Sequence, residues 1–259
     1  FLADDVEKIG NFYIQNTKIP NEIFENILKK ISSNNTIVEE ISKLERSSCF
    51  LEKSSNENEE EGKKKKGNSD NFKLNKEAQQ LQSQIDKLRK KIYYVSLDSK
   101  FVPNSVNHQK LWTPTGEVYE NAYVSNIGEE MTKKIMALPV ENYCKVLLLL
   151  GIGLFSTHNN RDYVEIIKQL AEEQRLFIII ASSDYIYGTN YQFCHGFLGK
   201  DLQELTQQKI IQAMGRVGRN NIQQQYTIRF RDTDMIRKIF TRQEENIEAI
   251  NLCRLFSSD

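Results

Sequence analysis

The sequence has few of the residues that build metal sites or disulfide frameworks. Its four cysteines include no CxxC pair, and its three histidines are dispersed, with only Cys194 and His195 adjacent. A zinc site needs clustered ligands at short spacing. The distribution therefore predicts no metal site, and it favours reduced thiols in an intracellular protein.

Long apolar runs and net charge are lacking as well. No run approaches the ~20 residues that cross a bilayer, so we expect no membrane segment. The 35 lysines and arginines equal the 35 aspartates and glutamates in number. The chain therefore has no overall field that would steer it toward nucleic acid, and any phosphate-binding function must depend on local basic residues.

The composition changes near residue 100. Upstream, apolar residues recur at helical spacing, and residues 36–53 and 73–93 are predicted to form a hairpin of two helices with the spacing of a coiled-coil seam. Residues 54–71 hold an acidic block and then a lysine block, with no apolar side chain to bury. This pattern predicts a disordered loop at the tip of the hairpin. We expect residues 1–94 to be a helical connector.

Downstream of residue 95 the pattern is that of an α/β domain. Helical segments alternate with short apolar runs, and the run LFIIIAS suits a strand covered on both faces. Such alternation favours a parallel sheet flanked by helices. The predicted helices cover residues 129–138, 162–174, 205–214 and 233–255, with another ending near Gly151, and the predicted strands cover 152–155, 176–182 and 226–230.

The stretch QAMGRVGR, residues 212–219, places two arginines three residues apart, each directly after a glycine. Guanidinium groups fork onto phosphate oxygens, and a preceding glycine leaves room for a phosphate-bearing partner. Arginines presented in this way act as arginine fingers on a γ-phosphoryl group. The alternative is a pair of solvent-exposed arginines at a helix end, decorating a structural α/β domain.

Three stretches in the same order resemble motifs of superfamily 2 helicases. QAMGRVGR resembles motif VI, Q-x-x-G-R-x-G-R, and ASSDYIYGTN, residues 181–190, resembles motif V, A-T-E-x-x-x-x-G-x-N. The pair Gly151-Ile152 resembles the G-I strand that precedes motif V. More narrowly, the stretch SDYIYGTNYQFCHGFLGKDL is similar to helicase-like proteins of giant DNA viruses, which implies an intracellular site such as the cytoplasm, the nucleus, a viral factory or the virion.

The resemblance implies a second RecA-like domain and a role for each matched residue. Arg216, Arg219 and Gln212 would serve catalysis at the ATP γ-phosphate, and Gly188, Asn190 and Gly215 would lie at the nucleotide. Contacts to the phosphates of RNA or DNA would come from a further group: Ser182, Ser183, Thr189, Asn160 and Arg161. For Asn160 and Arg161, capping of a helix N-terminus is an equally good interpretation.

The sequence also departs from the family. Ser183 stands where motif V has an acidic residue, and residues 121–126 are only a candidate for the motif IV strand. The chain has neither the phosphate loop G-x-x-x-x-G-K-[ST] nor the metal-binding D-E-x-[DH]. We therefore expect ATP and Mg²⁺ to be held mainly by a first RecA-like domain outside this chain.

These features together predict the C-terminal motor domain of an ATP-dependent helicase, inactive as a hydrolase by itself, over residues 95–259. The alternative is a catalytically inactive helicase-like scaffold that binds nucleic acid or protein partners through the coiled-coil hairpin.

Overall fold

The computed structural model describes residues 1–60, 68–155, 160–186, 193–202, 205–218, 225–241 and 247–256. Two compact units divide the chain. Unit 1 consists of residues 1–5 and 181–259, and unit 2 consists of residues 6–180. This division does not coincide with the change in composition near residue 95, because the N-terminal helices pack against helices that follow it.

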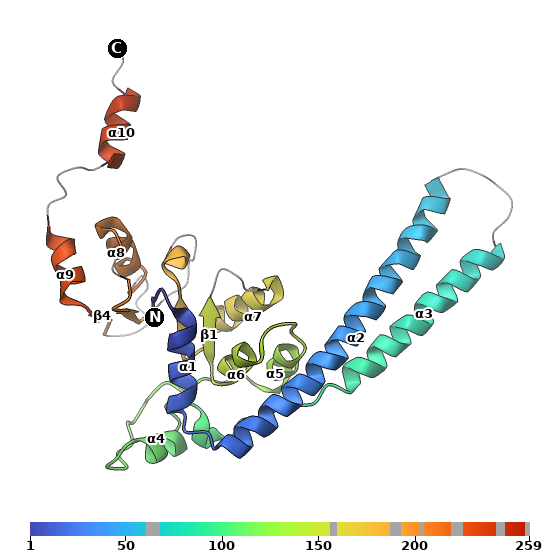
Figure 1. Cartoon of the computed structure of the whole chain (residues 1–259), viewed down its shortest axis with the longest axis horizontal. Coiled ribbons are helices and arrows are strands. Elements are labelled where there is room, and N and C mark those ends of the chain that lie inside the picture. Colours follow the sequence, from blue (N-terminus) through green and yellow to red (C-terminus); the bar gives the residue numbers. More distant parts are fainter. Residues whose placement is uncertain are drawn as a thin grey trace. The chain divides into compact units, whose positions relative to one another are not determined.

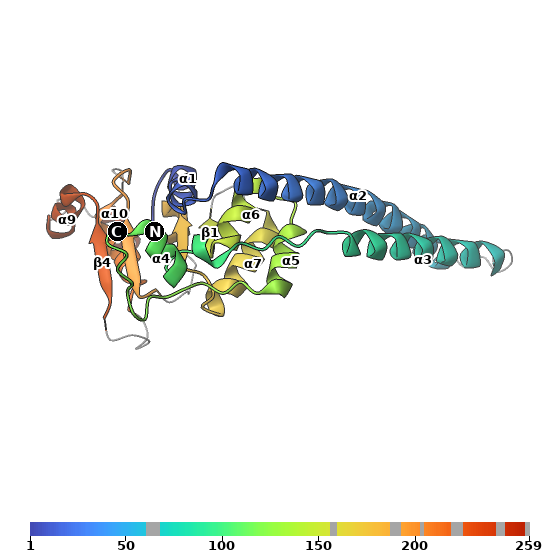
Figure 2. The ribbon, with the colours of Figure 1, turned by 90° about the horizontal axis from the view of Figure 1, so that it is seen from below.

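Unit 2 begins with α1 (Val6–Asn16), followed by two long helices, α2 (Asn21–Glu60) and α3 (Asn68–Lys90). The two long helices lie side by side in both ribbon views (Figures 1 and 2). Val38 and Ile41 of α2 and Ile85 of α3 are buried, and an ion pair joins Glu45 to Arg89 at 2.9 Å. A helical pair is therefore present, and coiled-coil packing stays a prediction.

The two long helices extend farther into the charged stretch than we expected. Residues 54–71 were predicted to be disordered, but α2 continues to Glu60 and α3 already begins at Asn68. Extending an existing helix adds one hydrogen bond per residue without a new nucleation cost. Polar residues can therefore continue these helices although they bury no apolar side chain. Residues 61–67 lie outside the described residues.

The body of unit 2 is built on a nearly fully buried helix, α6 (Asn142–Leu149), and the strand β1 (Ile152–Phe155) that follows it. Strand β1 pairs with β2 (Ile178–Ala181). Helix α7 (Arg161–Glu172) packs against β1 through Tyr163 and Ile167. The sequence predictions for these elements are confirmed to within a few residues. Two shorter helices complete the unit: α4 (Val106–Trp112) and α5 (Glu129–Met136), with a single 3₁₀ turn η1 (Ser99–Phe101) before them.

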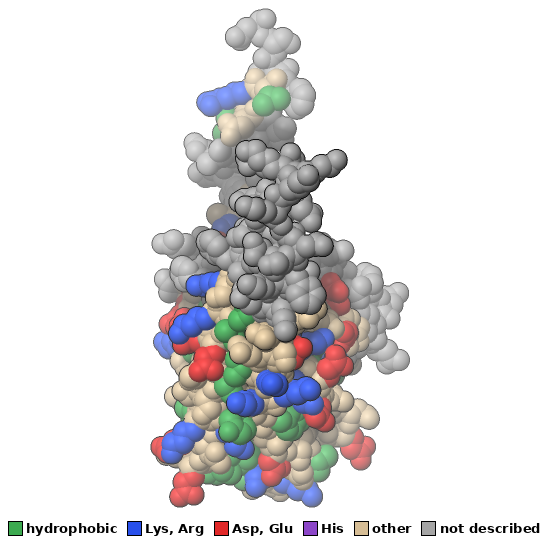
Figure 3. Space-filling model, turned by 90° about the vertical axis from the view of Figure 1, so that its right-hand side faces the viewer, with side chains coloured by type: hydrophobic (Ala, Val, Ile, Leu, Met, Phe, Trp, Pro, Cys, Tyr) green, Lys and Arg blue, Asp and Glu red, His purple; other side chains and the backbone are tan. Residues whose placement is uncertain are grey.

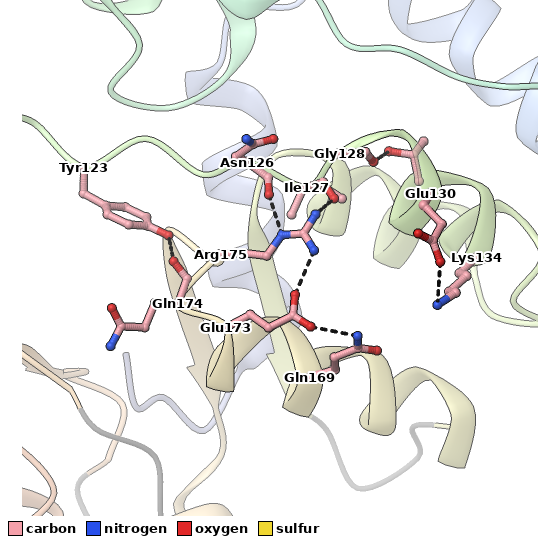
Figure 4. Close-up of polar contacts among 11 residues, drawn as sticks. Tyr123, Asn126, Ile127, Gly128, Glu130, Lys134, Gln169, Glu173, Gln174 and Arg175 are labelled. Atoms are coloured by element: carbon pink, nitrogen blue, oxygen red, sulfur yellow. Dashed lines mark hydrogen bonds and ion pairs between the residues drawn. The ribbon is translucent and has the colours of Figure 1, made fainter.

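Residues 121–126 do not form the motif IV strand that we considered for them. The segment is irregular, and Arg175 at the end of α7 holds its C-terminal part in place (Figure 4). The Arg175 guanidinium donates to the carbonyl of Asn126 at 2.8 Å and to that of Ile127, and it pairs with Glu173 at 2.8 Å. These contacts hold the end of the segment in an irregular conformation and not in a strand ladder.

Unit 1 contains β3 (His195–Leu198) and β4 (Thr227–Phe230), which pair in parallel with His195 opposite Thr227 and Leu198 opposite Phe230. The N-terminal residues supply a further strand-like segment, since Leu2 forms parallel bridges to both Ala181 and Leu198. Its backbone N–H donates to the Phe197 carbonyl at 2.9 Å, and its carbonyl accepts from Gly199 at 2.8 Å. We did not predict this segment from the sequence.

The helices of unit 1 are α8 (Gln207–Met214), α9 (Thr233–Phe240) and α10 (Ile247–Phe256), with a 3₁₀ turn η2 (Ser183–Ile186) after β2. A core cluster forms between β3, α8 and α9. It comprises Leu198, Leu202, Leu205, Ile210, Ala213 and Met235. The single helix predicted over residues 233–255 is wrong, because Thr241 is extended and ends α9.

The described parts of both units therefore show a mixed α/β protein with two small parallel two-stranded sheets. Within the described residues, no helix is long and apolar enough to cross a bilayer.

Candidate nucleotide and nucleic-acid interface

The QAMGRVGR stretch lies at the C-terminal end of α8. The helix begins at an N-cap, Thr206, whose hydroxyl accepts from the Lys209 N–H at 3.3 Å, and it ends at Gly215. Gln212 is exposed on the last turn, and Arg216 follows it by four residues. The helix has ended before position 216, so Arg216 belongs to the turn that follows α8.

A tight turn then carries the chain away from α8. The N–H of Arg216 donates to the Ala213 carbonyl at 3.2 Å, and the N–H of Val217 donates to that of Met214 at 3.1 Å. Val217 forms a parallel bridge with Phe193, and the Gly218 N–H donates to the Phe193 carbonyl at 3.0 Å. This bonding fixes the backbone on both sides of the Arg216 side chain.

The backbone conformation requires a glycine at only one of the two glycine positions in the stretch. Gly218 has φ +75°, a backbone conformation that L side chains rarely adopt, so the turn itself requires it. Gly215 has φ −66°, and a Cβ there would meet only the Gln212 and Ile211 carbonyls at 3.5 Å, which is ordinary contact. Nothing in the described residues demands a glycine at position 215.

The start of the motif V candidate includes the turn η2, which contacts α8. Ser182 and Ser183 follow strand β2 directly, and the turn η2, which contains Ser183, contacts α8 within unit 1. The structure thus brings the start of one candidate motif and the helix of the other together, although about 30 residues of sequence separate them. Gly188, Thr189, Asn190 and Arg219 lie outside the described residues.

The Ser182 hydroxyl is buried and has no hydrogen-bond partner among the described residues. Leaving a buried hydroxyl without a partner costs about 1–3 kcal/mol. The atom is also shielded from solvent, so a nucleic-acid phosphate does not reach it in this conformation. Burial therefore weakens the direct phosphate contact that the resemblance implied for this side chain.

Asn160 and Arg161 lie in unit 2, at the start of α7. The Asn160 side chain accepts from the Asp162 N–H at 2.8 Å and caps the helix, which confirms the capping interpretation for this residue. The Arg161 side chain is 90% exposed and pairs with Glu165 one turn along the helix at 3.2 Å. A surface pair of this kind contributes little to stability, so Arg161 is able to exchange its partner for a phosphate.

On the face shown in Figure 3, lysines and arginines are interspersed with acidic side chains. No group of three or more histidine, cysteine, aspartate or glutamate side chains in the described ranges is arranged to hold a metal ion.

Sequence reasoning missed a buried lysine. Lys145 on α6 has no exposed surface, and its Nζ donates to Asn35 Oδ1 at 2.6 Å and to the Met136 carbonyl at 3.0 Å. Burial lowers the pKa of this amine to about 8. Asn35 in turn donates to Asn142 Oδ1 at 2.8 Å. A lysine within the apolar run VENYCKVLLLL was the signal that could have revealed this polar contact between α6 and α2.

A second polar contact was also missed at the end of the hairpin. Asn34 is completely buried, and its side-chain amide forms two hydrogen bonds with the backbone of Tyr93, at 2.9 and 2.7 Å. This pair of bonds fixes the segment that leaves α3 against α2. Asn34 and Asn35 therefore both serve the attachment of the hairpin rather than a catalytic site.

Comparison with known proteins gave no match: no protein-family description fits the chain, and no curated protein or solved structure is significantly similar to it.

Proposed function

We propose that the chain is the second RecA-like domain of an ATP-dependent nucleic-acid helicase or translocase. The observation that carries the proposal is the contact within unit 1 between η2 and α8, because it joins the start of the ASSDYIYGTN stretch to the helix of the QAMGRVGR stretch. Parallel pairing of β3 with β4, and of Leu2 with its two neighbours, supports a parallel α/β core.

In this proposal, ATP and Mg²⁺ are held mainly by a first RecA-like domain, and this chain completes the site from the other side. Arg216 and Arg219 would bind the γ-phosphate of that ATP, since guanidinium groups fork onto phosphate oxygens. Bound ATP would supply the phosphoryl group whose hydrolysis gates opening and closing of the cleft between the domains. The backbone bonds around Val217 would keep Arg216 oriented during this motion.

The experiment is nucleic-acid-stimulated ATP hydrolysis by a protein that carries this chain together with a first RecA-like domain. Arg216→Ala or Arg219→Ala should lower the rate about 10³-fold or more while ATP binding is retained, because fingers act on the transition state. Arg237→Ala is the matched control, since Arg237 is an exposed arginine on α9 paired with Asp234. Unchanged turnover in both arginine variants would refute the proposal.

The same measurement distinguishes an active motor domain from an inactive helicase-like scaffold. A wild-type protein that binds nucleic acid without any ATP turnover would favour an inactive helicase-like scaffold that uses the α2–α3 pair as its binding surface.

A further inference from the structure

Helices α8 and α9 of unit 1 expose three large apolar side chains near the place where hydrogen bonds join the two helices. Ile211 of α8 is 50% exposed, and Ile236 and Phe240 of α9 are 39% and 82% exposed. We name these three residues the α8–α9 face. The opposite sides of both helices supply residues of the core cluster, including Ile210 and Met235. The α8–α9 face is therefore the outer side of a packed pair of helices.

A single glutamine shows that the three side chains lie close together. Gln207, the first residue of α8, donates from Nε2 to the carbonyls of Ile239 and Thr241, at 2.7 and 3.0 Å. The start of α8 is thus fixed to the end of α9. Ile211 lies one turn beyond Gln207 on the same side of α8, because residues four apart share one side of a helix. The other two residues of the face are also four apart, on the last turns of α9. All three therefore border the point at which the chain leaves α9.

Helix α10 has a matching apolar side. Seven of its ten residues are apolar, and the three polar ones are Glu248, Asn251 and Arg254. Because these three are spaced three residues apart, they form one stripe and leave a broad apolar side opposite. Ile250 and Leu255 are nevertheless 40% and 78% exposed. The helix therefore has more apolar surface than its own contacts cover.

The length of α10 indicates that it depends on packing. Isolated helices shorter than about 12–15 residues are marginal in water, and most helical stability in proteins comes from the packing of an apolar side. A helix of ten residues therefore needs a surface to pack against.

The chain itself holds α10 near the α8–α9 face. Six residue steps separate Thr241, which ends α9, from Ile247, which begins α10. Since each step spans at most about 3.6 Å, α10 begins within about 20 Å of the end of α9. A short tether of this kind gives an effective concentration in the millimolar range. The helix of the same chain therefore has an advantage over a second copy or another protein that must bind from solution.

We propose that α10 docks on the α8–α9 face of its own chain. Its apolar side would cover Ile211, Ile236 and Phe240, and its polar stripe would face water. This inference is independent of the helicase proposal, because it uses no residue of the QAMGRVGR stretch or of the motif V candidate.

The test is cross-linking of the whole chain through Cys253, which is exposed on α10 and lies on its apolar side by spacing. Ile236→Cys places a second thiol in the α8–α9 face. Lys238→Cys is the matched control, because Lys238 is exposed on the opposite side of the same helix at nearly the same distance along the chain. A short bis-maleimide is added, and the linked peptides are identified by mass spectrometry.

The thiol at position 236 should link to Cys253 at least about tenfold faster than the thiol at position 238. The tether alone brings both positions to Cys253 about equally, whereas docking holds only the first one beside it.

A charge on the apolar side of α10 should abolish this difference. In the Ile236→Cys chain, Ile250→Asp should lower the linking rate to that of the Lys238→Cys control, because an unpaired carboxylate is costly to bury against apolar side chains. Asn251→Asp adds the same charge to the polar stripe and should leave the fast rate unchanged.

Three results would overturn the proposal. The first is an equal linking rate for the thiols at positions 236 and 238, and the second is an unchanged fast rate in the Ile250→Asp variant. The third is a link that forms only between two chains, in a yield that rises with protein concentration. That result would assign the α8–α9 face to a second copy.

Discussion

Replacement of the buried lysine gives the sharpest quantitative test of unit 2. The Lys145 ammonium is removed from water and bonded to only two carbonyl-type oxygens, and burial lowers its pKa from 10.5 to about 8. A shift of one pKa unit corresponds to 1.36 kcal/mol, so the burial of the charged form costs about 3 kcal/mol.

The sign of the pH dependence follows from the direction of that shift. Below pH 8 the amine is charged in both the folded and the unfolded chain, and the full cost is present. Between pH 8 and 10.5 the folded chain has lost the proton and the unfolded chain still binds it. The free energy of unfolding therefore gains about 1.4 kcal/mol per pH unit from this group as the pH rises through that window.

The assay is urea unfolding of the wild type and of Lys145→Met at pH 7, 8, 9 and 10, followed by circular dichroism. Methionine keeps much of the side-chain length but cannot titrate. The difference in unfolding free energy, wild type minus variant, should rise by about 2–3 kcal/mol across this range. Lys168→Met, on the exposed face of α7, is the matched control.

A difference that is independent of pH for Lys145→Met would refute the reasoning. The value at a single pH does not decide the matter, because methionine also leaves the Asn35 and Met136 oxygens without their donor, which costs about 1–3 kcal/mol for each.

Three further perturbations test the fold. Gly151 has φ +78°, and a Cβ there would clash with the Ser125 side chain. Gly151→Ala should therefore cost about 2–4 kcal/mol in urea unfolding, and adding Ser125→Gly should recover the steric part but not the ~1 kcal/mol of backbone strain. Burial lowers the pKa of His108. The free energy of unfolding should therefore fall as the pH drops below 6.5, because the unfolded chain binds the proton first. A His108→Gln variant with the same pH profile as the wild type would contradict this. Arg175→Ala should lower the free energy of unfolding by about 2 kcal/mol in thermal unfolding, because two carbonyls of the segment before α5 lose a charged donor. Arg175→Lys should recover only part of this loss. Full recovery by lysine would argue against a forked contact.

Local periodicity determined much of the secondary structure in advance. The apolar stripes and caps placed α5, α6, α7 and α8 within a few residues, and the short apolar runs placed β1, β2 and β4. These elements bury enough of their own apolar residues for the spacing alone to identify them. The predicted hairpin was also present as a pair of packed helices, although its helices extend farther than their apolar residues do.

Other features depended on contacts between distant residues. Leu2, which pairs with both Ala181 and Leu198, lies in a run too short to be predicted as a strand, and only its distant neighbours give it strand-like pairing. Residues 121–126 were a candidate for the motif IV strand, but they are irregular, and Arg175 binds the carbonyls at and just after their end. In both cases the hydrogen-bond partners come from sequence more than 40 residues away.

The same distinction between local sequence and tertiary contacts applies to the candidate site. The sequence by itself determined its chemistry: two arginines after glycines, and serines after an apolar strand. The tertiary structure decided which of the two glycines the backbone requires: Gly218 has a positive φ, and Gly215 does not. It also decided that η2 contacts α8 and that the Ser182 hydroxyl is buried, because burial and contact depend on what packs around a residue and not on its own identity.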